Sequence, residues 1–377
     1  MTLFLFSFFS LYSLLHLYLL IKVRGAFSLN GRHLAVIIPF LVIMILSPVI
    51  IRQLEKQGLD EFARFFSYAG YTWMGLLLLF CSISIPIDIW GFFVTRINGY
   101  LNRDPLFLVI PGNISFVISL SLSLIIAFYG YFEAQDIRVE RHIIESPKIP
   151  RRIRIVQISD LHIGLIIRGE RVKRVVEMIQ GEQPDILVST GDLVDGQINS
   201  LRGIDELFRE IKPGYGKFAI TGNHEFYAGL GQAIDFTERA GFRVLRGEGI
   251  TVSDLINIVG VDDPAGKAYD SYIDISEREL LSRFPAERFT VLLKHRPIVK
   301  KDSIGLFDLQ LSGHTHKGQI FPFSIFTYLY YPIHAGKMNL TDSSYLYVSR
   351  GTGTWGPPIR FLSPPEITVI DLVPKIR

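Results

Sequence analysis

Long apolar runs fill the first third of the chain, and shorter apolar runs separated by polar residues fill the rest. The long runs are residues 2–21, 34–51, 69–87 and 114–132. Each is close to the ~20 residues that a helix needs to cross the hydrocarbon core of a bilayer. Buried core helices would not gather in one third of a sequence with almost no charge. We therefore predict an all-α transmembrane region at residues 1–135 with four spans.

Two polar residues accompany these runs. An ionisable group inside lipid usually marks a functional site. Asp88, however, lies at the end of the third run, close to Trp90, and we interpret it as an interfacial residue. We interpret His16, inside the first run, as a helix-packing residue.

The lysines and arginines of the loops predict the orientation, because cytoplasmic loops are enriched in basic residues. Four spans place both chain ends on one side. That side holds Arg52, Lys56, Arg64, Arg138, Arg141, Lys148, Arg151, Arg152 and Arg154, and the other holds Lys22, Arg24, Arg32, Arg96 and Arg103. The count predicts a multi-pass protein of the cell membrane with a cytoplasmic C-terminal domain. The basic residues around the first span all follow it, which favours the opposite orientation.

The pattern changes after residue 150. Pro147 and Pro150 lie in a segment that we interpret as a linker, residues 136–150, so that a second domain covers residues 151–377. Its strand-like runs are residues 153–159, 185–189, 217–220 and 289–293, and residues 171–179 have helical spacing. Strands that alternate with helices predict an α/β fold around a mostly buried sheet.

Composition narrows the possible partners. The mean hydropathy of +0.31 agrees with a membrane region. A net charge of +3 and the lack of a basic face with interleaved aromatics predict no nucleic-acid partner. Cys81 is the single cysteine, which excludes an intramolecular disulfide and a cysteine-rich zinc site.

Residues of metal-binding types follow several of the predicted strands. They form five motifs: Asp160-Leu161-His162, Gly191-Asp192-Leu193-Val194-Asp195, Gly222-Asn223-His224-Glu225, Lys294-His295-Arg296 and Gly313-His314-Thr315-His316. The last motif alone is weak evidence for a site. Side chains just past the carboxyl ends of strands meet in one crevice in open α/β sheets, however, so motifs far apart in sequence can converge.

The residue types indicate the chemistry of this site. Carboxylate and imidazole donors suit Mn²⁺, Fe or Zn²⁺ better than Ca²⁺, which prefers oxygen ligands alone. Two divalent ions about 3.5–4 Å apart can clamp an in-line displacement and lower the pKa of a water that they share. A carboxylate must bridge two such ions, and Asp192 is the natural candidate. We therefore predict a hydrolytic site with two divalent metal ions.

The five motifs, in this order, resemble those of the calcineurin-like metallophosphoesterases. Within that superfamily the chain is similar to the small bacterial phosphodiesterase branch with N-terminal membrane segments. The resemblance covers about residues 153–372 and makes residues 151–377 a catalytic domain. It implies a metallophosphoesterase-type β-sandwich of two mixed sheets flanked by helices.

The resemblance also implies residue roles. One metal ion would be bound by Asp160, His162, Asp192 and His316, and the other by Asp192, Asn223, His295 and His314. Asp192 and His224 would be catalytic, with His224 protonating the leaving oxygen or steadying the phosphate. Asp195 would hold its loop by hydrogen bonds.

Several weaker signals leave alternatives open. Lys317 stands where many relatives have glycine, and it could reach a phosphate or point to solvent. Asp262 and Asp263 could be a second acidic ligand set or a turn before Pro264. Residues 349–353 could cradle a phosphate or form a tight turn. Arg360 could contact substrate phosphate, although a surface arginine is the default.

The stretch of residues 320–331 is rich in phenylalanine and tyrosine and directly follows the last motif. It could wall an apolar chain or enter the membrane interface. Packing against a sheet is the slightly favoured alternative.

These observations predict a membrane-anchored phosphoesterase with two metal ions that hydrolyses a phosphodiester or pyrophosphate bond. A membrane-bound site favours a lipid-linked substrate among membrane lipids, for which a UDP-diacyl-sugar is one option. The alternatives are a phosphoprotein phosphatase and a non-catalytic metal-binding membrane module.

Overall fold

The computed structural model describes residues 2–27, 29–100, 108–196, 201 and 203–375. Arg103, counted above in a loop, lies outside these residues. The chain divides into two compact units. The membrane unit is Met1–Phe132 with Gly356–Phe361, and the sheet unit is Glu133–Trp355 with Leu362–Arg377.

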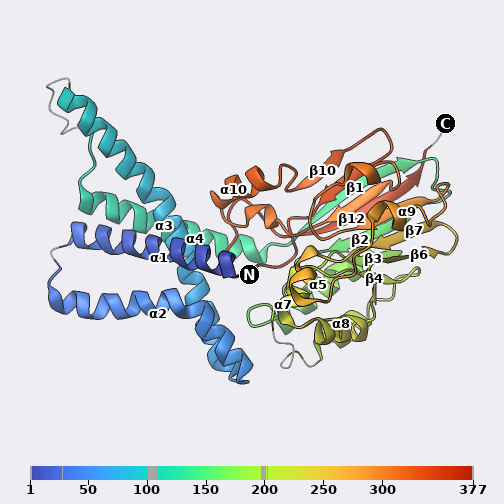
Figure 1. Ribbon diagram of the computed structural model, residues 1–377, viewed down its shortest axis with the longest axis horizontal. Coiled ribbons are helices and arrows are strands. Elements are labelled where there is room, and N and C mark those ends of the chain that lie inside the picture. The colour runs from blue at the N-terminus through green and yellow to red at the C-terminus, as the bar shows by residue number, and fades with distance from the viewer. Residues whose placement is uncertain (1, 28, 101–107, 197–200, 202, 376–377) are drawn as a thin grey trace. The chain divides into compact units, whose positions relative to one another are not determined.

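Four long apolar helices make up most of the described part of the membrane unit (Figure 1). They are α1 (Thr2–Ala26), α2 (Gly31–Lys56), α3 (Asp60–Tyr100) and α4 (Gly112–Gln135). Each is long and apolar enough to cross a membrane, which confirms the four predicted helices. With 41 residues, α3 is about twice as long as a hydrocarbon core is thick, because its polar flanks continue the helix beyond the apolar run.

Polar side chains join these helices to one another. Asp88 on α3 accepts hydrogen bonds from Lys22 Nζ and Tyr18 Oη on α1, both at 2.7 Å. His16 Nε2 accepts a hydrogen bond of 2.9 Å from Trp73 Nε1. His16 therefore packs α1 against α3, in agreement with its interpretation as a helix-packing residue.

The segment predicted as a linker contains a strand, so that prediction was wrong. Strand β1 (Arg138–Ser146) pairs in parallel with β12 (Glu366–Pro374) along its whole length. Its sequence, RVERHIIES, is too polar to be recognised as a buried strand. It is the edge strand of a sheet, so one side of its backbone forms no strand pairing, and several of its side chains are exposed.

Two six-stranded mixed sheets form the described part of the sheet unit, which confirms the expected sandwich. One has the order β1-β12-β2-β3-β4-β5, and the other β10-β11-β9-β8-β7-β6. The strands of the first sheet not yet introduced are β2 (Ile153–Ile158), β3 (Ile186–Ser189), β4 (Lys217–Ala219) and β5 (Arg243–Val244). Those of the second are β6 (Glu248–Val252), β7 (Ile256–Gly260), β8 (Phe289–Leu293), β9 (Leu309–Ser312), β10 (Gly336–Asn339) and β11 (Tyr345–Val348).

Short helices flank these sheets. They are α5 (Gly169–Gly181), α6 (Ile204–Arg209), α7 (Asn223–Ala228), α8 (Leu230–Arg239), α9 (Glu277–Leu281) and α10 (Phe323–Tyr330). The 3-10 turns are η1 (Pro264–Tyr269), η2 (Lys301–Ser303) and η3 (His316–Gly318).

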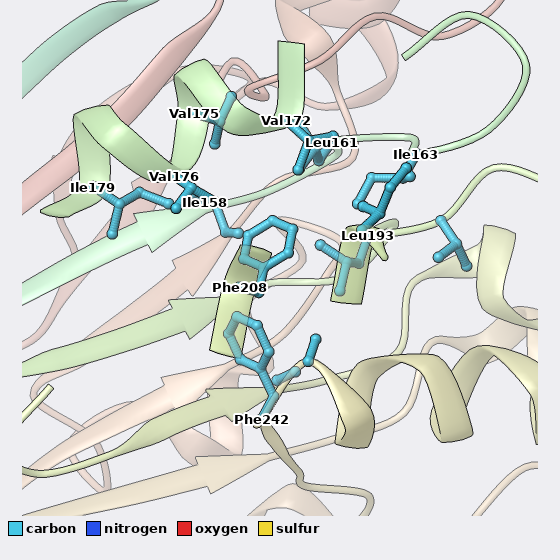
Figure 2. Close-up of a cluster of buried hydrophobic side chains, with 14 of the residues drawn as sticks. Ile158, Leu161, Ile163, Val172, Val175, Val176, Ile179, Leu193, Phe208 and Phe242 are labelled. Atoms are coloured by element: carbon cyan, nitrogen blue, oxygen red, sulfur yellow. The ribbon is translucent and has the colours of Figure 1, made fainter. Parts of the chain in front are cut away.

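The central strands are apolar on both faces because each face is covered. On β2, Ile155 belongs to the core between the two sheets, whereas Ile158 belongs to the core beneath the helices. Figure 2 shows Val176 of α5 beside Ile158 in this second core. Burial on both faces explains why these strands read as continuous apolar runs rather than as alternating patterns.

Two neighbouring isoleucines on β1 test whether this segment belongs to the folded unit. Ile144 is 2% exposed and Ile143 is 65% exposed. We expect Ile144→Ala to lower the free energy of unfolding by about 2–5 kcal/mol, because it leaves a cavity in the core. The matched control, Ile143→Ala, should change it by less than about 0.5 kcal/mol. Denaturation of the detergent-solubilised full chain measures both, and equal small effects would restore the linker interpretation.

Candidate metal centre

The predicted ligands lie just past the carboxyl ends of five strands that have parallel neighbours. Asp160 and His162 follow β2, Asp192 follows β3, Asn223 and His224 follow β4, His295 follows β8, and His314 and His316 follow β9. Asn223 and His224 also open helix α7. The two sheets thus bring residues more than 150 positions apart to one rim of the sandwich.

Three groups of possible ligand atoms meet at this rim, one of them His162, Asp192 and His224, and the other two made up entirely of predicted metal ligands. Asp160, His162 and His316 form one group, with the Nε2 atoms of the two histidines 3.1 Å apart. Asp192, His295 and His314 form the other, with His295 Nε2 at 3.1 Å from His314 Nδ1.

Asp192 links the two groups. Its Oδ2 lies 3.2 Å from Nε2 of His295, in its own group, and 3.9 Å from Nε2 of His162, in the group of Asp160 and His316. The Asp192 carboxylate thus lies between the histidines of one ligand group and those of the other, which is where a carboxylate that bridges two metal ions would lie.

The unpaired atoms of the site fit bound cations. Asn223 Oδ1 is buried without a hydrogen-bond partner among the described residues, although a buried amide oxygen normally has one. His295 Nδ1 lies 2.8 Å from the carbonyl of Thr190. If Nδ1 donates its proton there, the lone pair of Nε2 faces Asp192 and His314, as in a metal-bound histidine oriented by a backbone carbonyl. The residues present therefore fit a centre of two divalent ions.

The charges of the site favour added positive charge. Burial alone would lower the pKa of His295, but the carboxylates of Asp192 and Asp160 outweigh it and raise this pKa to about 10. Burial lowers the pKa of His314 well below its ordinary value, and the neighbouring His295 and Arg296 lower it further. Divalent cations would supply the positive charge that the carboxylates demand without protonating the imidazoles.

The loops that carry the ligands adopt an unusual backbone. Asp160, His162, Asp192, His314 and His316 all have φ between 47° and 71°, the left-handed region that non-glycine residues rarely occupy. Such residues cost about 1–3 kcal/mol each and are concentrated at functional sites. The backbone conformation that directs these side chains toward the site therefore lowers the free energy of unfolding.

Glycines before the ligands allow close approach. A Cβ on Gly222 would lie 2.2 Å from Asp192 Oδ1, and one on Gly313 would lie 2.2 Å from Asp160 Oδ2. Both distances are shorter than any real contact. Glycine is thus required before Asn223 and before His314 because a carboxylate passes close to the backbone at both positions.

Glu225 was part of a motif, but its role was missed by sequence reasoning. Its carboxylate accepts hydrogen bonds from the backbone N–H groups of Gly222, Asp192 and Leu193, at 2.6–3.0 Å. It thereby joins the loop after β3 to the loop after β4. Its place in the first turn of α7, where acidic residues cap helices, was the available signal.

Asp195 contacts two histidines of the site. Its Oδ1 lies 2.9 Å from His224 Nδ1 and 3.3 Å from His162 Nδ1. Burial alone would lower the pKa of His224, but Asp192 and Asp195 outweigh it and raise this pKa to about 9. With Nδ1 of His224 directed at Asp195, Nε2 is the nitrogen left to act on a substrate.

An aromatic rim surrounds these histidines. The rings of Tyr227 and Trp355 have centroids 5.2 and 6.2 Å from that of His224, and the Tyr331 ring lies 5.5 Å from that of His314. Gln319 anchors the Trp355 backbone by two hydrogen bonds. Trp355 lies almost forty residues past the last motif, so no sequence signal connected it to the site.

The acidic pair that could have been a second ligand set has other partners. Asp262 forms an ion pair of 2.7 Å with Arg246, and Asp263 one of 2.7 Å with Arg296. Asp263 also caps η1 by accepting a hydrogen bond from Ala265 N, as expected of a turn. The two carboxylates therefore serve structure.

Two further alternatives are decided by burial and hydrogen bonding. The N–H groups of Thr352 and Gly353 donate to Ser159 O and Asp160 O, and that of Gly351 donates to Ser349 Oγ, so residues 349–353 do not offer these groups to a phosphate. Arg360 is fully buried and its N–H donates to Gly130 O inside the membrane unit, so its interpretation as a surface residue was wrong. Lys317 is partly exposed, which leaves both of its readings open.

Comparisons with known proteins agree with this site. The sequence profile of the calcineurin-like phosphoesterase family matches residues 153–318. A metallophosphoesterase of Aquifex aeolicus is 40% identical over 258 residues, which are 67% of this chain and 98% of that protein. One of Bacillus subtilis is 35% identical over 264 residues, 65% of this chain and 89% of that protein. The chain belongs to the calcineurin-like metallophosphoesterases.

A further relative extends the similarity toward the N-terminus. A transmembrane protein with a metallophosphoesterase domain from Danio rerio is 29% identical over 325 residues, 80% of this chain and 74% of that protein. Residues 136–377 make up a smaller share of the chain, so this match reaches into the membrane unit. The chain is thus a membrane protein with a metallophosphoesterase domain.

Metal content tests the linking position of Asp192. We expect the reconstituted full chain to hold about two divalent ions, and Asp192→Ala to lose more than one, because it removes a donor from both groups. His295→Ala should lose about one. Mass spectrometry of the eluted metals measures all three, with the exposed Asp254→Ala as a control. Wild-type metal content in Asp192→Ala would contradict the bridge.

Proposed function

We propose that this chain hydrolyses a phosphodiester or pyrophosphate bond of a lipid-linked substrate at the surface of the cell membrane, with its metal centre on the cytoplasmic side. The phosphoesterase class follows from the family. The observation that carries the proposal is Asp192 between two imidazole groups, with His224 and an aromatic rim beside them. The membrane helices and the aromatic rim support a substrate with a lipid part, such as a UDP-diacyl-sugar.

Each residue of the centre has a role in this proposal. Bound divalent ions (Mn²⁺, Fe or Zn²⁺) would neutralise phosphoryl charge and lower the pKa of water in the site. One ion would be held by Asp160, His162, Asp192 and His316, and the other by Asp192, Asn223, His295 and His314. The left-handed loops and the Glu225 hydrogen bonds keep these donors in place before substrate arrives, which reduces the reorganisation required in the transition state.

His224 would supply the proton for the leaving oxygen. Asp195 accepts from Nδ1 and orients the ring, as a carboxylate orients the histidine in many hydrolases. A pKa raised above neutrality keeps His224 protonated before the bond breaks. Metal ions on Asp192 would weaken that raising effect, but the contribution of Asp195 would remain.

The dependence on the leaving group tests the role of His224. If this residue protonates the leaving oxygen, His224→Asn should slow cleavage of an alkyl phosphodiester by roughly 10²–10⁴-fold. Cleavage of a nitrophenyl phosphodiester should be slowed far less, because nitrophenolate leaves without a proton. Rates with Mn²⁺ restored after chelation measure both. An equal loss on the two substrates would assign His224 to holding the phosphate instead.

Substrate comparison separates the proposed function from its rivals. We expect turnover of a diester to exceed turnover of a phosphoserine peptide, and Asp192→Ala to abolish it. Faster peptide turnover would indicate a phosphoprotein phosphatase. Metal binding without turnover of any phosphoester would indicate a non-catalytic module, although such a module has no use for the His224–Asp195 pair. Lipid extracts of cells with and without the gene should differ in one phosphorylated lipid.

A further inference from the structure

We propose that helix α10 is a membrane-docking element: it lies in the head-group region of the bilayer and holds the metal centre at the lipid surface. This assigns a bilayer-contacting surface to the sheet unit, in addition to the four membrane helices. It goes beyond the proposed function, since it does not depend on which bond is cleaved.

The side chains of α10 are exposed although they are apolar. The helix reads FSIFTYLY and contains no charged residue. None of its eight residues, all of them described, is buried. Phe326 is 63% exposed, Leu329 71% and Tyr330 73%. For residues 323–330 this finding contradicts the favoured alternative, which was packing against a sheet, whereas Ile320 and Tyr331 at the ends of the stretch 320–331 are buried.

The distribution of these side chains distinguishes lipid from a protein groove as the occupant. A helix that binds a groove keeps one polar face for water. On α10 six aromatic or aliphatic side chains are exposed, whereas its two polar residues, Ser324 and Thr327, are half-buried and Thr327 Oγ1 donates to Phe323 O of its own helix. Two exposed tyrosines, Tyr328 and Tyr330, lie at its C-terminal end, and tyrosine is enriched where hydrocarbon meets water. This composition suits an interface in which part of the helix is surrounded by lipid.

The flanks of α10 complement anionic head groups. The partly exposed Lys317 precedes it, and the exposed Lys337 follows it on β10. Basic residues near an anionic leaflet are attracted to it. Phe321 before the helix and Met338 after it are also exposed, at 42% and 44%, so the apolar surface continues beyond the helix.

The chain that carries this helix also carries its own membrane-spanning candidates. These are four helices that are able to cross a membrane, so docking is an intramolecular event with a high effective concentration. A second copy or another protein would first have to be recruited. The occupant that we assign is therefore the lipid surface.

Docking at α10 would act directly on the metal centre. The helix begins five residues after η3, which contains His316, and Tyr331 at its end contacts the His314 ring. Thr315 Oγ1 donates a hydrogen bond of 2.6 Å to the carbonyl oxygen of His334, which follows the C-terminal end of the helix in the chain. Both ends of α10 are thus tied to the last metal motif, so a docked helix places the motif next to the head groups.

Fluorescence of a labelled full chain tests the docking. In a Cys81→Ser background, Leu329→Cys carries an environment-sensitive fluorophore, and the protein is placed in nanodiscs with one copy each. We expect blue-shifted emission, strong quenching by lipids spin-labelled near the head group, and at least threefold weaker quenching by iodide than in the control. The control is Lys173→Cys on the exposed face of α5.

The outcomes separate the possible occupants. Iodide quenching at 329 as strong as at 173, without lipid quenching, would overturn the proposal. Protection that appears only when two copies share a nanodisc, with energy transfer between their labels, would also overturn it and assign the surface to a second copy. The labelled positions 329 and 173 are exposed, and the buried Cys81 changes only from sulfur to oxygen. Unchanged metal content then verifies that the sheet unit is folded.

Activity supplies a second, independent readout. Phe326→Ser combined with Leu329→Ser should slow hydrolysis of a bilayer-embedded phosphoester at least fivefold and leave a soluble aryl diester unaffected. Equal rates on the embedded substrate would count against docking. If no phosphoester is cleaved at all, the proposed function fails, but the fluorescence result still decides the docking.

Discussion

Buried negative charge is the constraint on which the sheet unit depends. Asp160, Asp192 and Glu225 are at most 3% exposed, and their carboxylates share one rim of the sandwich. An unpaired buried carboxylate is costly, and several together are costlier still. Backbone N–H groups satisfy Glu225, and a ring of imidazoles surrounds the two aspartates. Divalent ions would neutralise the negative charge that remains. The interactions that stabilise the buried carboxylates would then be the same ones that form the metal centre.

The loops around the centre show how the fold directs this charge. Strand ends deliver the ligand residues, left-handed backbone turns the side chains inward, and glycines let a carboxylate pass close to the backbone. Glu225 and Asp195 then hold the loops and the rings. Removing a ligand and removing one of these supports are therefore different perturbations: the first changes what the site can bind, and the second changes how accurately the donors are placed.

In the proposed function, the membrane and the metal centre act on the same substrate. A phosphoester with a lipid part presents its polar group at the head-group level, where an enzyme free in water meets it poorly. This chain carries apolar helices for the hydrocarbon core and an exposed apolar helix tied to both ends of its last metal motif. We regard α10 as the link between the two, because its side chains are suited to lipid and its ends contact the site.

What the sequence by itself determined were the properties that are local in the chain. Apolar runs of bilayer length predicted the membrane helices, and strands followed by Asp, His or Asn predicted the metal ligands. Each of these signals is contained within a short segment of the chain. Tertiary structure alone decided the properties that depend on distant partners. Strand β1 exists because β12, more than two hundred residues later, completes its hydrogen bonds. Trp355 reaches His224 only through the folded loops, and whether the side chains of α10 are exposed or packed is decided by the segments around the helix and not by its own sequence. Burial and pairing are relations between segments, which a pattern along one segment does not contain.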